Sequence, residues 1–292
     1  MSLSRPIKFP ILKLPWLCIE SVVRSWNIFD IIFFAGISQK TRRIVKILKI
    51  PLNGIEVYLT YCKTNIALMT YTHQNLRNFL KMAMEFLNEV FNCSVETVEI
   101  NGDSFPESGE VGVKSTVNLS VDLPFKYAQG QKLSLLLENL EVTGTCTLRM
   151  AIIEKDFYVE PKLFKCRELV FLSGSGAWIT REILLQFEIP QLTFFVSPFS
   201  GEDIAAFVTN WFHSDNKKLE YLYIGHQNEH TSLKQLRRLN PFPFSQRNRI
   251  PPSESFTRID FSKGLEIVRQ DGLQATIHVT ERDFLFYIWR NQ

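Results

Sequence analysis

The most constraining feature of the sequence is a short segment, Ile28–Ile37, that is apolar on nearly every side. It reads IFDIIFFAGI, and Asp30 is its single charged residue. Asn27 can cap a helix at this point, with the Asp30 carboxylate near the positive end of the helix dipole. A helix that is apolar all round needs cover on every side in water. The segment therefore predicts a helix that packs against other helices or against a partner.

Two further short helices are predicted beside this segment. Pro15 favours the start of the first one, and apolar residues then recur at three- and four-residue spacing: Trp16, Ile19, Val23 and Trp26. Ser38 can cap the last one, which ends before Pro51. Three such helices rarely bury enough surface to stand alone, so either the rest of the chain or another protein covers the excess. The pattern leaves both alternatives open.

The pattern changes after Pro51, where short β-rich segments alternate with one long amphipathic segment. The turn-rich residues 101–110 mark a soft boundary. Two methionines of the amphipathic segment, Met82 and Met84, are expected to fill gaps in a core. The predicted elements are a hairpin of Ile55–Cys62 and Ile66–Thr72, a helix over Asn75–Phe91 and a strand over Val95–Ile100.

A loose repeat follows beyond residue 140. Four strand-like segments carry leucines at intervals typical of leucine-rich-type repeats, namely Leu148, Leu169, Leu192 and Leu219. Helix-like segments occupy Thr180–Phe187 and Gly201–Phe212, whereas the interval from Leu148 to Leu169 holds no clear helix. Helices that return between strands predict parallel pairing and an α/β solenoid. The alternative is an ordinary α/β domain with evenly spaced strands.

The N-terminal helices resemble the F-box, a three-helix motif that docks onto the Skp adaptor of cullin-RING ubiquitin ligases. The matching residues are Leu14-Pro15, Val22-Val23, Trp26, Asp30-Ile31 and Ile37-Ser38. The stretch FPILKLPWLCIESVVRSW is closest to the nematode-expanded subfamily of this motif. The departures from the usual pattern are Leu17, Ile28, Ala35-Gly36 and Thr41. Of these, Gly36 weakens a helix interior by about 1 kcal/mol relative to alanine.

The C-terminal half resembles the type 2 F-box-associated domain that follows such F-boxes. Its blocks read SGSGAWITREILLQ, EDIAAFVTNWF, NKKLEYLYI and FSKGLEIVRQDGLQATIHV, with the aromatic tail FLFYIW. The resemblance implies a substrate receptor, in which the F-box holds the ligase and the C-terminal domain holds the protein to be ubiquitinated. Residues 5–50 then form the F-box, 51–109 a linking strand-helix region, and 110–292 the F-box-associated domain.

The fold class expected from these features is α+β, with a three-helix F-box followed by an α/β leucine-rich-repeat-like solenoid. The implied partners are a Skp-type adaptor, a cullin reached through it, and an unidentified target. The residues expected at the adaptor are Pro10, Leu14, Pro15, Leu17, Ile19, Val22, Val23, Trp26, Ile31, Ile32 and Ile37. The alternative is a protein-binding module whose degenerate F-box has no ligase role.

No residues nominate catalysis, a metal site or a cofactor. His226 and His230 lie four apart without the Glu position of a His-Glu-x-x-His zinc site, and a polar loop is the better interpretation. Residues 173–176, SGSG, lack the spacing of a nucleophile elbow and predict a turn after a strand. His278 is expected at the surface of a strand. A non-catalytic receptor subunit needs no such site, because it contributes proximity by binding.

A basic segment at 231–252 surrounds the aromatic run Pro-Phe-Pro-Phe244. Its cations are Lys234, Arg237, Arg238, Arg247 and Arg249. Basic residues among aromatic ones can bind RNA or an acidic partner, and a solvated, proline-stiffened loop is the alternative. If the segment binds, an acidic face of the target is favoured over nucleic acid.

Composition sets broad limits on location. The 292 residues are 45% hydrophobic with a net charge of +3, too mild to indicate a nucleic-acid binder by itself. Five scattered cysteines without a Cys-x-x-Cys pair indicate free thiols in a reducing compartment. The start of the chain lacks a secretory signal pattern. The most hydrophobic segment, residues 28–37, is shorter than the ~20 residues of a membrane helix. We therefore expect a soluble protein of the cytoplasm, the nucleus or both.

Overall fold

The computed structural model describes residues 11–50, 55–61, 73–91, 94–102, 105, 111–123, 130–150, 156–196, 198–225, 233–245 and 261–290. The chain forms two compact units. The helical unit takes residues 1–55 and 71–94, and the sheet unit takes residues 56–70 and 95–292. The predicted domain boundaries at residues 50 and 109 stay a prediction.

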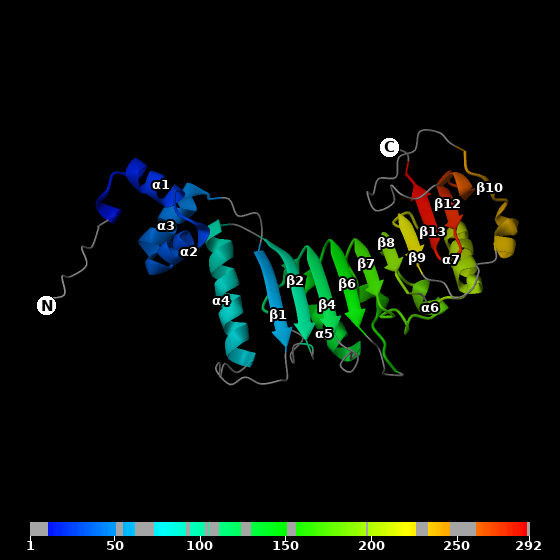
Figure 1. Cartoon of the computed structure of the whole chain (residues 1–292), viewed down its shortest axis with the longest axis horizontal. Coiled ribbons are helices and arrows are strands. Elements are labelled where there is room, and N and C mark those ends of the chain that lie inside the picture. Colours follow the sequence, from blue (N-terminus) through cyan, green and yellow to red (C-terminus); the bar gives the residue numbers. More distant parts are fainter. Residues whose placement is uncertain are drawn as a thin grey trace. The chain divides into compact units, whose positions relative to one another are not determined.

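The described residues of the helical unit form four α-helices preceded by a 3-10 turn, η1 (Ile11–Lys13) (Figure 1). The helices are α1 (Trp16–Arg24), α2 (Ile28–Ile37), α3 (Gln39–Leu48) and α4 (His73–Phe91). The three short helices and the long one are confirmed. The methionines of α4 differ from expectation: Met82 is 69% exposed and Met84 is half-buried, because α4 turns Val90 and its neighbours toward the other helices.

Side-chain hydrogen bonds cap the starts of α2 and α3 where the sequence predicts them. The Asn27 side chain accepts a hydrogen bond from the Asp30 backbone N–H at 3.0 Å. Ser38 and Thr41 form a reciprocal capping box at the start of α3, with each side chain accepting from the other residue's backbone N–H. Each bond satisfies a backbone donor that a helix start leaves without an intrahelical partner.

One hydrophobic core holds the helical unit together. Val23, Ala35 and Val45 are fully buried in it, and Val90 joins them from α4. The cluster also includes Ile19, Ile31, Phe34, Ile44 and Leu48. Each of the four α-helices therefore contributes side chains to this core.

The sheet unit is built on a mixed sheet whose described strands lie in the order β1-β2-β4-β6-β7-β8-β9-β13-β12-β11-β10 (Figure 1). Strands β2 to β9 are parallel to their neighbours, and the pairs from β9 to β10 are antiparallel. The parallel part contains β2 (Val95–Gly102), β4 (Asn118–Leu123), β6 (Thr145–Met150), β7 (Glu168–Leu172), β8 (Gln191–Phe194) and β9 (Tyr221–Ile224). The remaining strands are β1 (Ile55–Tyr61), β10 (Phe242–Pro243), β11 (Leu265–Val268), β12 (Gln274–Val279) and β13 (Phe284–Trp289), with β3 (Ser115–Thr116) and β5 (Glu141–Val142) pairing separately.

One face of the sheet carries the core in rows that cross the strands. The first row joins Val98, Leu119, Cys146, Leu169, Leu192, Leu222 and Phe286, and each of these side chains is at most 1% exposed. Helix α7 packs on this face, because Trp211 contacts the Phe286 ring with 5.0 Å between ring centroids. The connecting elements are α5 (Gly130–Asn139), η2 (Pro161–Leu163), α6 (Arg181–Leu184), α7 (Gly201–His213), η3 (Leu233–Leu239) and η5 (Phe261–Lys263).

The architecture is therefore α+β, but a leucine-rich-repeat-like solenoid is not shown. The connections differ in length and type, and the sheet ends in antiparallel strands. The predicted leucine register is also wrong in part. Leu148 aligns with Phe171 rather than with Leu169, and Leu192 aligns with Leu222 rather than with Leu219. The register of two strands depends on which of their side chains share the buried face. The positions of leucines in the sequence do not by themselves determine that register.

Single-residue predictions had mixed outcomes. The SGSG turn after β7 is confirmed, with Ser173 and Gly174 at positive φ. The surface position of His278 is wrong, because the imidazole is 8% exposed and lies near Phe261, at 6.3 Å between ring centroids. Cys18, Cys146 and Cys166 are free thiols, as expected. The predicted strand at 66–72 and the loop at 226–230 lie outside the described residues.

Candidate functional site

The predicted adaptor-binding residues divide by their exposure in the helical unit. Ile19, Val23 and Ile31 lie in the core, where they support the surface without reaching it. Pro15, Leu17 and Ile37 are exposed. Leu14, Val22, Trp26 and Ile32 are half-buried, and Pro10 lies outside the described residues. The accessible apolar surface therefore includes side chains that sequence reasoning did not single out.

The main part of that surface is a stripe along α2, here called the α2 stripe, formed by Phe29, Phe33 and Ile37. These side chains are 78%, 81% and 67% exposed. Residues four apart on a helix share one face, so the three lie in line. Ile31, Phe34 and Ala35 occupy the buried side of the same helix. The four-residue spacing of these residues is present in the sequence. It does not stand out there, because the other faces of the helix are also apolar.

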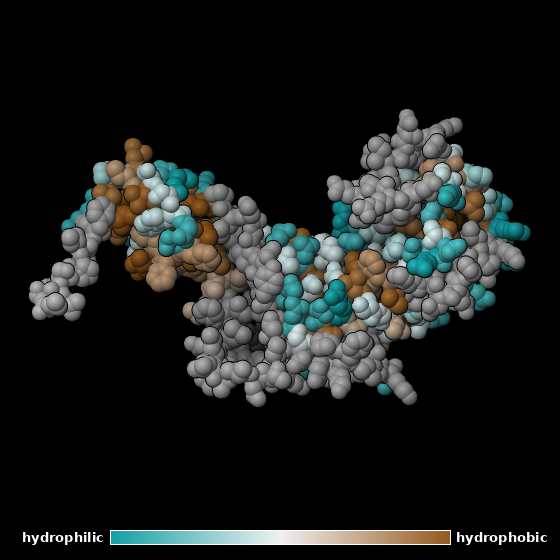
Figure 2. All heavy atoms as spheres, in the orientation of Figure 1, coloured by the Kyte–Doolittle hydropathy of each residue, from teal (hydrophilic) through white to brown (hydrophobic). Residues whose placement is uncertain are grey.

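The α2 stripe borders a groove of about 850 Å³ between α2, α3 and α4. Phe33 and Ile37 form one wall, and Met82 and Phe86 of α4 contribute to the opposite one. Arg42 ties α3 to α4, because its guanidinium lies 4.8 Å from the centroid of the Phe86 ring and bonds to Glu89 at 3.2 Å. Figure 2 shows hydrophobic atoms covering much of this unit's visible surface. The groove offers an apolar side chain or helix a partly preformed site.

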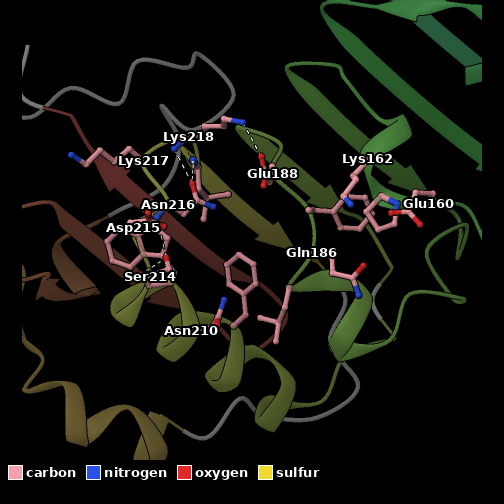
Figure 3. Close-up of a pocket in the computed structure, with 16 residues that line it drawn as sticks. Glu160, Lys162, Gln186, Glu188, Asn210, Ser214, Asp215, Asn216, Lys217 and Lys218 are labelled. Atoms are coloured by element: carbon pink, nitrogen blue, oxygen red, sulfur yellow. Dashed lines mark hydrogen bonds and ion pairs between the residues drawn. The ribbon is translucent and has the colours of Figure 1, made fainter. Parts of the chain in front are cut away.

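The sheet unit contains a second hollow, a pocket of about 680 Å³ (Figure 3). Glu160 and Lys162 lie at one side of it, and residues 214–218 lie at the other, with Asn210 and Gln186 between them. The rim contains an ion pair between Lys218 and Glu188 at 2.8 Å. The carboxylates and ammonium groups of the rim balance, so the pocket shows no strong charge preference. Its aromatic floor and polar rim suit a protein surface or peptide.

On the sheet face opposite the core, the side chains of β4, β6 and β7 are half-buried or exposed, whereas Thr193 of β8 and Tyr221 of β9 are buried. The side chains of this face form rows in register, one of which runs through Asn118, Thr145, Glu168, Gln191 and Tyr221. The Glu168 carboxylate accepts hydrogen bonds from the Tyr221 hydroxyl at 2.7 Å and from the Thr145 hydroxyl at 3.1 Å. Burial, aided by the bond to Glu168, raises the pKa of Tyr221, so its hydroxyl remains a donor. We call this surface the open sheet face.

An apolar patch lies two rows further along the same face. Phe195, which follows β8, is 44% exposed and contacts the Tyr223 ring at 5.9 Å between centroids. Leu172 aligns beside it, because the Phe195 N–H bonds to the carbonyl of Phe171. Tyr223 also donates a hydrogen bond to Asp283 at 3.1 Å. Burial, followed by the charge of Asp283, raises the pKa of Tyr223 to about 12.

The predicted basic segment is only partly described. Arg237 and Arg238 are exposed on η3, and Lys234 lies on the same turn. Arg247 and Arg249 lie outside the described residues, so the cluster as a whole is not tested. Among the residues that the structure describes, no three metal-ligating side chains gather as a possible ion site. None of the described helices has the length and apolar character needed to cross a membrane.

The comparisons with known proteins point to the sheet unit. Residues 161–224 match the family model described as F-box associated. This segment includes most of the pocket lining, together with half-buried Glu168 and exposed Phe195 of the open sheet face. The expected resemblance to F-box-associated proteins is confirmed through it.

A curated relative has been identified in a nematode. It is the uncharacterized protein F59B2.8 of Caenorhabditis elegans, with 33% identity over 115 residues. The match covers 35% of this chain and 25% of the relative, so the chain spans about a quarter of that protein's length. No solved structure matches the chain.

Proposed function

We propose that the chain is a non-catalytic substrate receptor of a Skp-cullin-F-box ubiquitin ligase in the cytoplasm or nucleus. The helical unit binds a Skp-type adaptor, and through it a cullin, while the sheet unit binds the protein to be ubiquitinated. The F-box associated match at 161–224 supports the receptor role of the sheet unit. The single observation that carries the adaptor role is the α2 stripe, which leaves Phe29, Phe33 and Ile37 in water.

The energetics favour an interface at this stripe. Fully burying a large apolar side chain contributes roughly 1.5–3 kcal/mol, so three in line can supply much of a stable complex. Exposed apolar surface concentrated on one helix is typical of a protein interface, whereas scattered apolar residues are not. The core residues Ile19, Val23 and Ile31 hold α1 and α2 in place beneath the surface. In this proposal they shape the site and do not touch the adaptor.

The test is co-expression of the full chain with a Skp-type adaptor, followed by size-exclusion chromatography. The wild-type chain is expected to elute as a stoichiometric complex. The double variant Phe29→Ala with Phe33→Ala is expected to elute apart from the adaptor, because both side chains lie on the stripe. Ile47→Ala is the control, since Ile47 is 64% exposed on α3 outside the stripe.

Two outcomes would count against the proposal. If the wild-type chain does not bind the adaptor, the ligase role is excluded and the alternative, a protein-binding module, is favoured. A complex that survives the double variant unchanged would remove the α2 stripe as the adaptor site. Circular dichroism of each variant checks that the helices remain folded, so that lost binding reports on the surface.

A further inference from the structure

The open sheet face combines an oriented carboxylate with an apolar patch, and this combination selects a class of binding partner. The face belongs to the unit that the proposed function assigns to target binding, so the inference rests on that proposal and makes it more specific. Its residues come from β2, β4, β6, β7, β8 and β9, whose parallel register places alternate side chains on this side.

The charges on this face are mainly negative. Its acidic side chains among the described residues are Glu99, Asp122, Glu168 and Asp283, together with Glu220, which accepts a hydrogen bond from Gln191 at 2.6 Å. The neighbouring described cations are paired: Arg149 with Asp122 at 3.4 Å, and Arg167 and Arg290 with Glu220 at 3.3 and 3.7 Å. Glu168 forms no ion pair with any described residue. Its two oxygens accept bonds from neutral hydroxyls only, those of Tyr221 and Thr145. The described cations around Glu168 are therefore already paired with Asp122 and Glu220, and the Glu168 carboxylate has no matching cation among the described residues.

The two hydroxyl bonds fix the Glu168 carboxylate in one orientation. Carboxylate oxygens have lone pairs beyond those used by two donors, so Glu168 can still accept from a guanidinium or ammonium group. A charge-assisted bond to an arginine is stronger than a bond between neutral groups and often bidentate. Because the two hydrogen bonds already fix the Glu168 side chain, binding a cationic partner costs little additional side-chain entropy in this protein.

The apolar patch sets the second requirement. Leu172 lies four residues after Glu168 on the same side of β7, and Phe195 lies beside it. Four residues along a strand span roughly 13 Å, which is also the reach of four residues in an extended peptide. Figure 2 shows hydrophilic atoms over β4 and β6 and hydrophobic atoms over β7 and β8. An arginine at Glu168 would place an apolar residue four positions away on the patch.

We propose that the open sheet face binds an extended cationic segment of the target protein, with an arginine or lysine at Glu168 and an apolar side chain against Phe195 and Leu172. This occupant is favoured over nucleic acid, because phosphates would meet the uncompensated carboxylates of the face. The basic segment of 231–252 plays no part in this proposal.

The test is fluorescence anisotropy of dye-labelled peptides with the full chain. In one peptide an arginine is followed four residues later by a leucine on a serine background, and a second of equal length has glutamate in place of the arginine. The first is expected to bind and the second is not. Glu168→Gln is expected to weaken binding by about tenfold or more, because it removes the charge and keeps the shape. Glu138→Gln, an exposed carboxylate on α5, is the matched control and is expected to leave the affinity unchanged.

Phe195→Ala provides a second variant that does not alter charge. It is expected to weaken the arginine-leucine peptide while leaving the salt dependence of binding as in the wild type, whereas Glu168→Gln flattens that dependence. Equal affinity of the peptide for wild type and Glu168→Gln would overturn the proposal, and so would absence of peptide binding. Tighter binding of a single-stranded RNA of equal length would also overturn it.

This experiment separates the inference from the proposed function. Peptide binding is measured on the free chain, without an adaptor. A chain that forms the adaptor complex but ignores the cationic peptide would contradict this inference alone. A chain that binds the peptide at Glu168 but ignores the adaptor would contradict the ligase role alone.

Discussion

At the scale of single residues, short-range hydrogen bonds explain how the helical unit is organised. Asn27 and Ser38 begin helices because each accepts a hydrogen bond from a backbone N–H three residues later. Such contacts are local, so the sequence was sufficient to predict them. Thr41, which departs from the usual F-box pattern, has a local role of its own: its hydroxyl completes the capping box with Ser38.

The burial of His278 was not predictable in the same way. Its strand alternates like one with a solvated face, but Phe261 from η5 lies over that face. The cover comes from a segment distant in sequence.

Removing the Ser38 hydroxyl tests the capping box. Ser38→Ala is expected to lower the free energy of unfolding of the helical unit by about 1 kcal/mol, because a helix-start N–H loses its partner. Urea unfolding followed by circular dichroism measures the change. Ser21→Ala, on the exposed side of α1, is expected to have little effect. Equal losses for the two variants would contradict a special role for the cap.

Two glycines are expected to respond to alanine in opposite ways. A Cβ added at Gly36 meets no atom within 4 Å, so Gly36→Ala is expected to stabilise α2 by up to about 1 kcal/mol. A Cβ at Gly144 would lie 2.8 Å from the Val117 carbonyl oxygen, so Gly144→Ala is expected to destabilise the sheet unit. Thermal unfolding of both variants measures the signs. A destabilised Gly36→Ala chain would contradict the open environment described for that position.

At the scale of elements, composition predicted which segments form helices and strands better than it predicted their pairing. The strands β2, β6, β7, β8 and β9 and the helices α4, α6 and α7 lie within a few residues of their expected positions. Strand β4 was missed although Leu119, Val121 and Leu123 alternate with polar residues at the period of a strand. Helix α5 was missed because it is short and most of its apolar residues form one run, 135–137, with no clear helical period. The strand register was missed in part, since it depends on which side chains share the buried face. The open sheet face could therefore not be assembled from the sequence.

Helix α7 offers a test of electrostatics at the level of one element. Asp203 lies in its first turn, accepts from the Ser200 backbone N–H at 2.9 Å and bonds to Arg181. Partial burial opposes ionisation of Asp203, but the bonds from Ser200 and the Arg181 charge outweigh it and lower the pKa. A carboxyl with a lowered folded-state pKa stabilises the fold above its unfolded pKa, about 4, and loses that contribution as the pH falls further.

Asp203→Asn is accordingly expected to be less stable than wild type at neutral pH, with the difference shrinking as the pH falls below about 4. Urea unfolding across that pH range measures the difference. Glu202→Gln, a neighbouring exposed carboxylate, is the control, because it makes no hydrogen bond or ion pair with a described residue. A stability gap for Asp203→Asn that stays constant with pH would show that charge is not the cause.

At the scale of the whole molecule, the chain is interleaved between its two units. Strand β1 belongs to the sheet unit, yet the following helix, α4, belongs to the helical unit and adds Val90 to its core. A chain shortened to begin after α3 would expose this face of α4. Point variants in the full chain are therefore cleaner tests than truncation. Sequence reading placed α4 in a linking region, because the contact of α4 with α3 is not local and leaves no periodic signal.

In the proposed function, the helical unit presents the α2 stripe to a Skp-type adaptor. Titration calorimetry of the purified adaptor into the full chain tests it with a matched pair of variants, Ile37→Ala and Ile47→Ala. Both replace an isoleucine of similar exposure, 67% and 64%, but Ile37 lies on the stripe and Ile47 does not. Ile47→Ala is expected to keep wild-type affinity, and Ile37→Ala is expected to lose about tenfold, equivalent to about 1.4 kcal/mol. Equal affinities for the two variants, or no heat of binding with the wild-type chain, would contradict this role of the stripe.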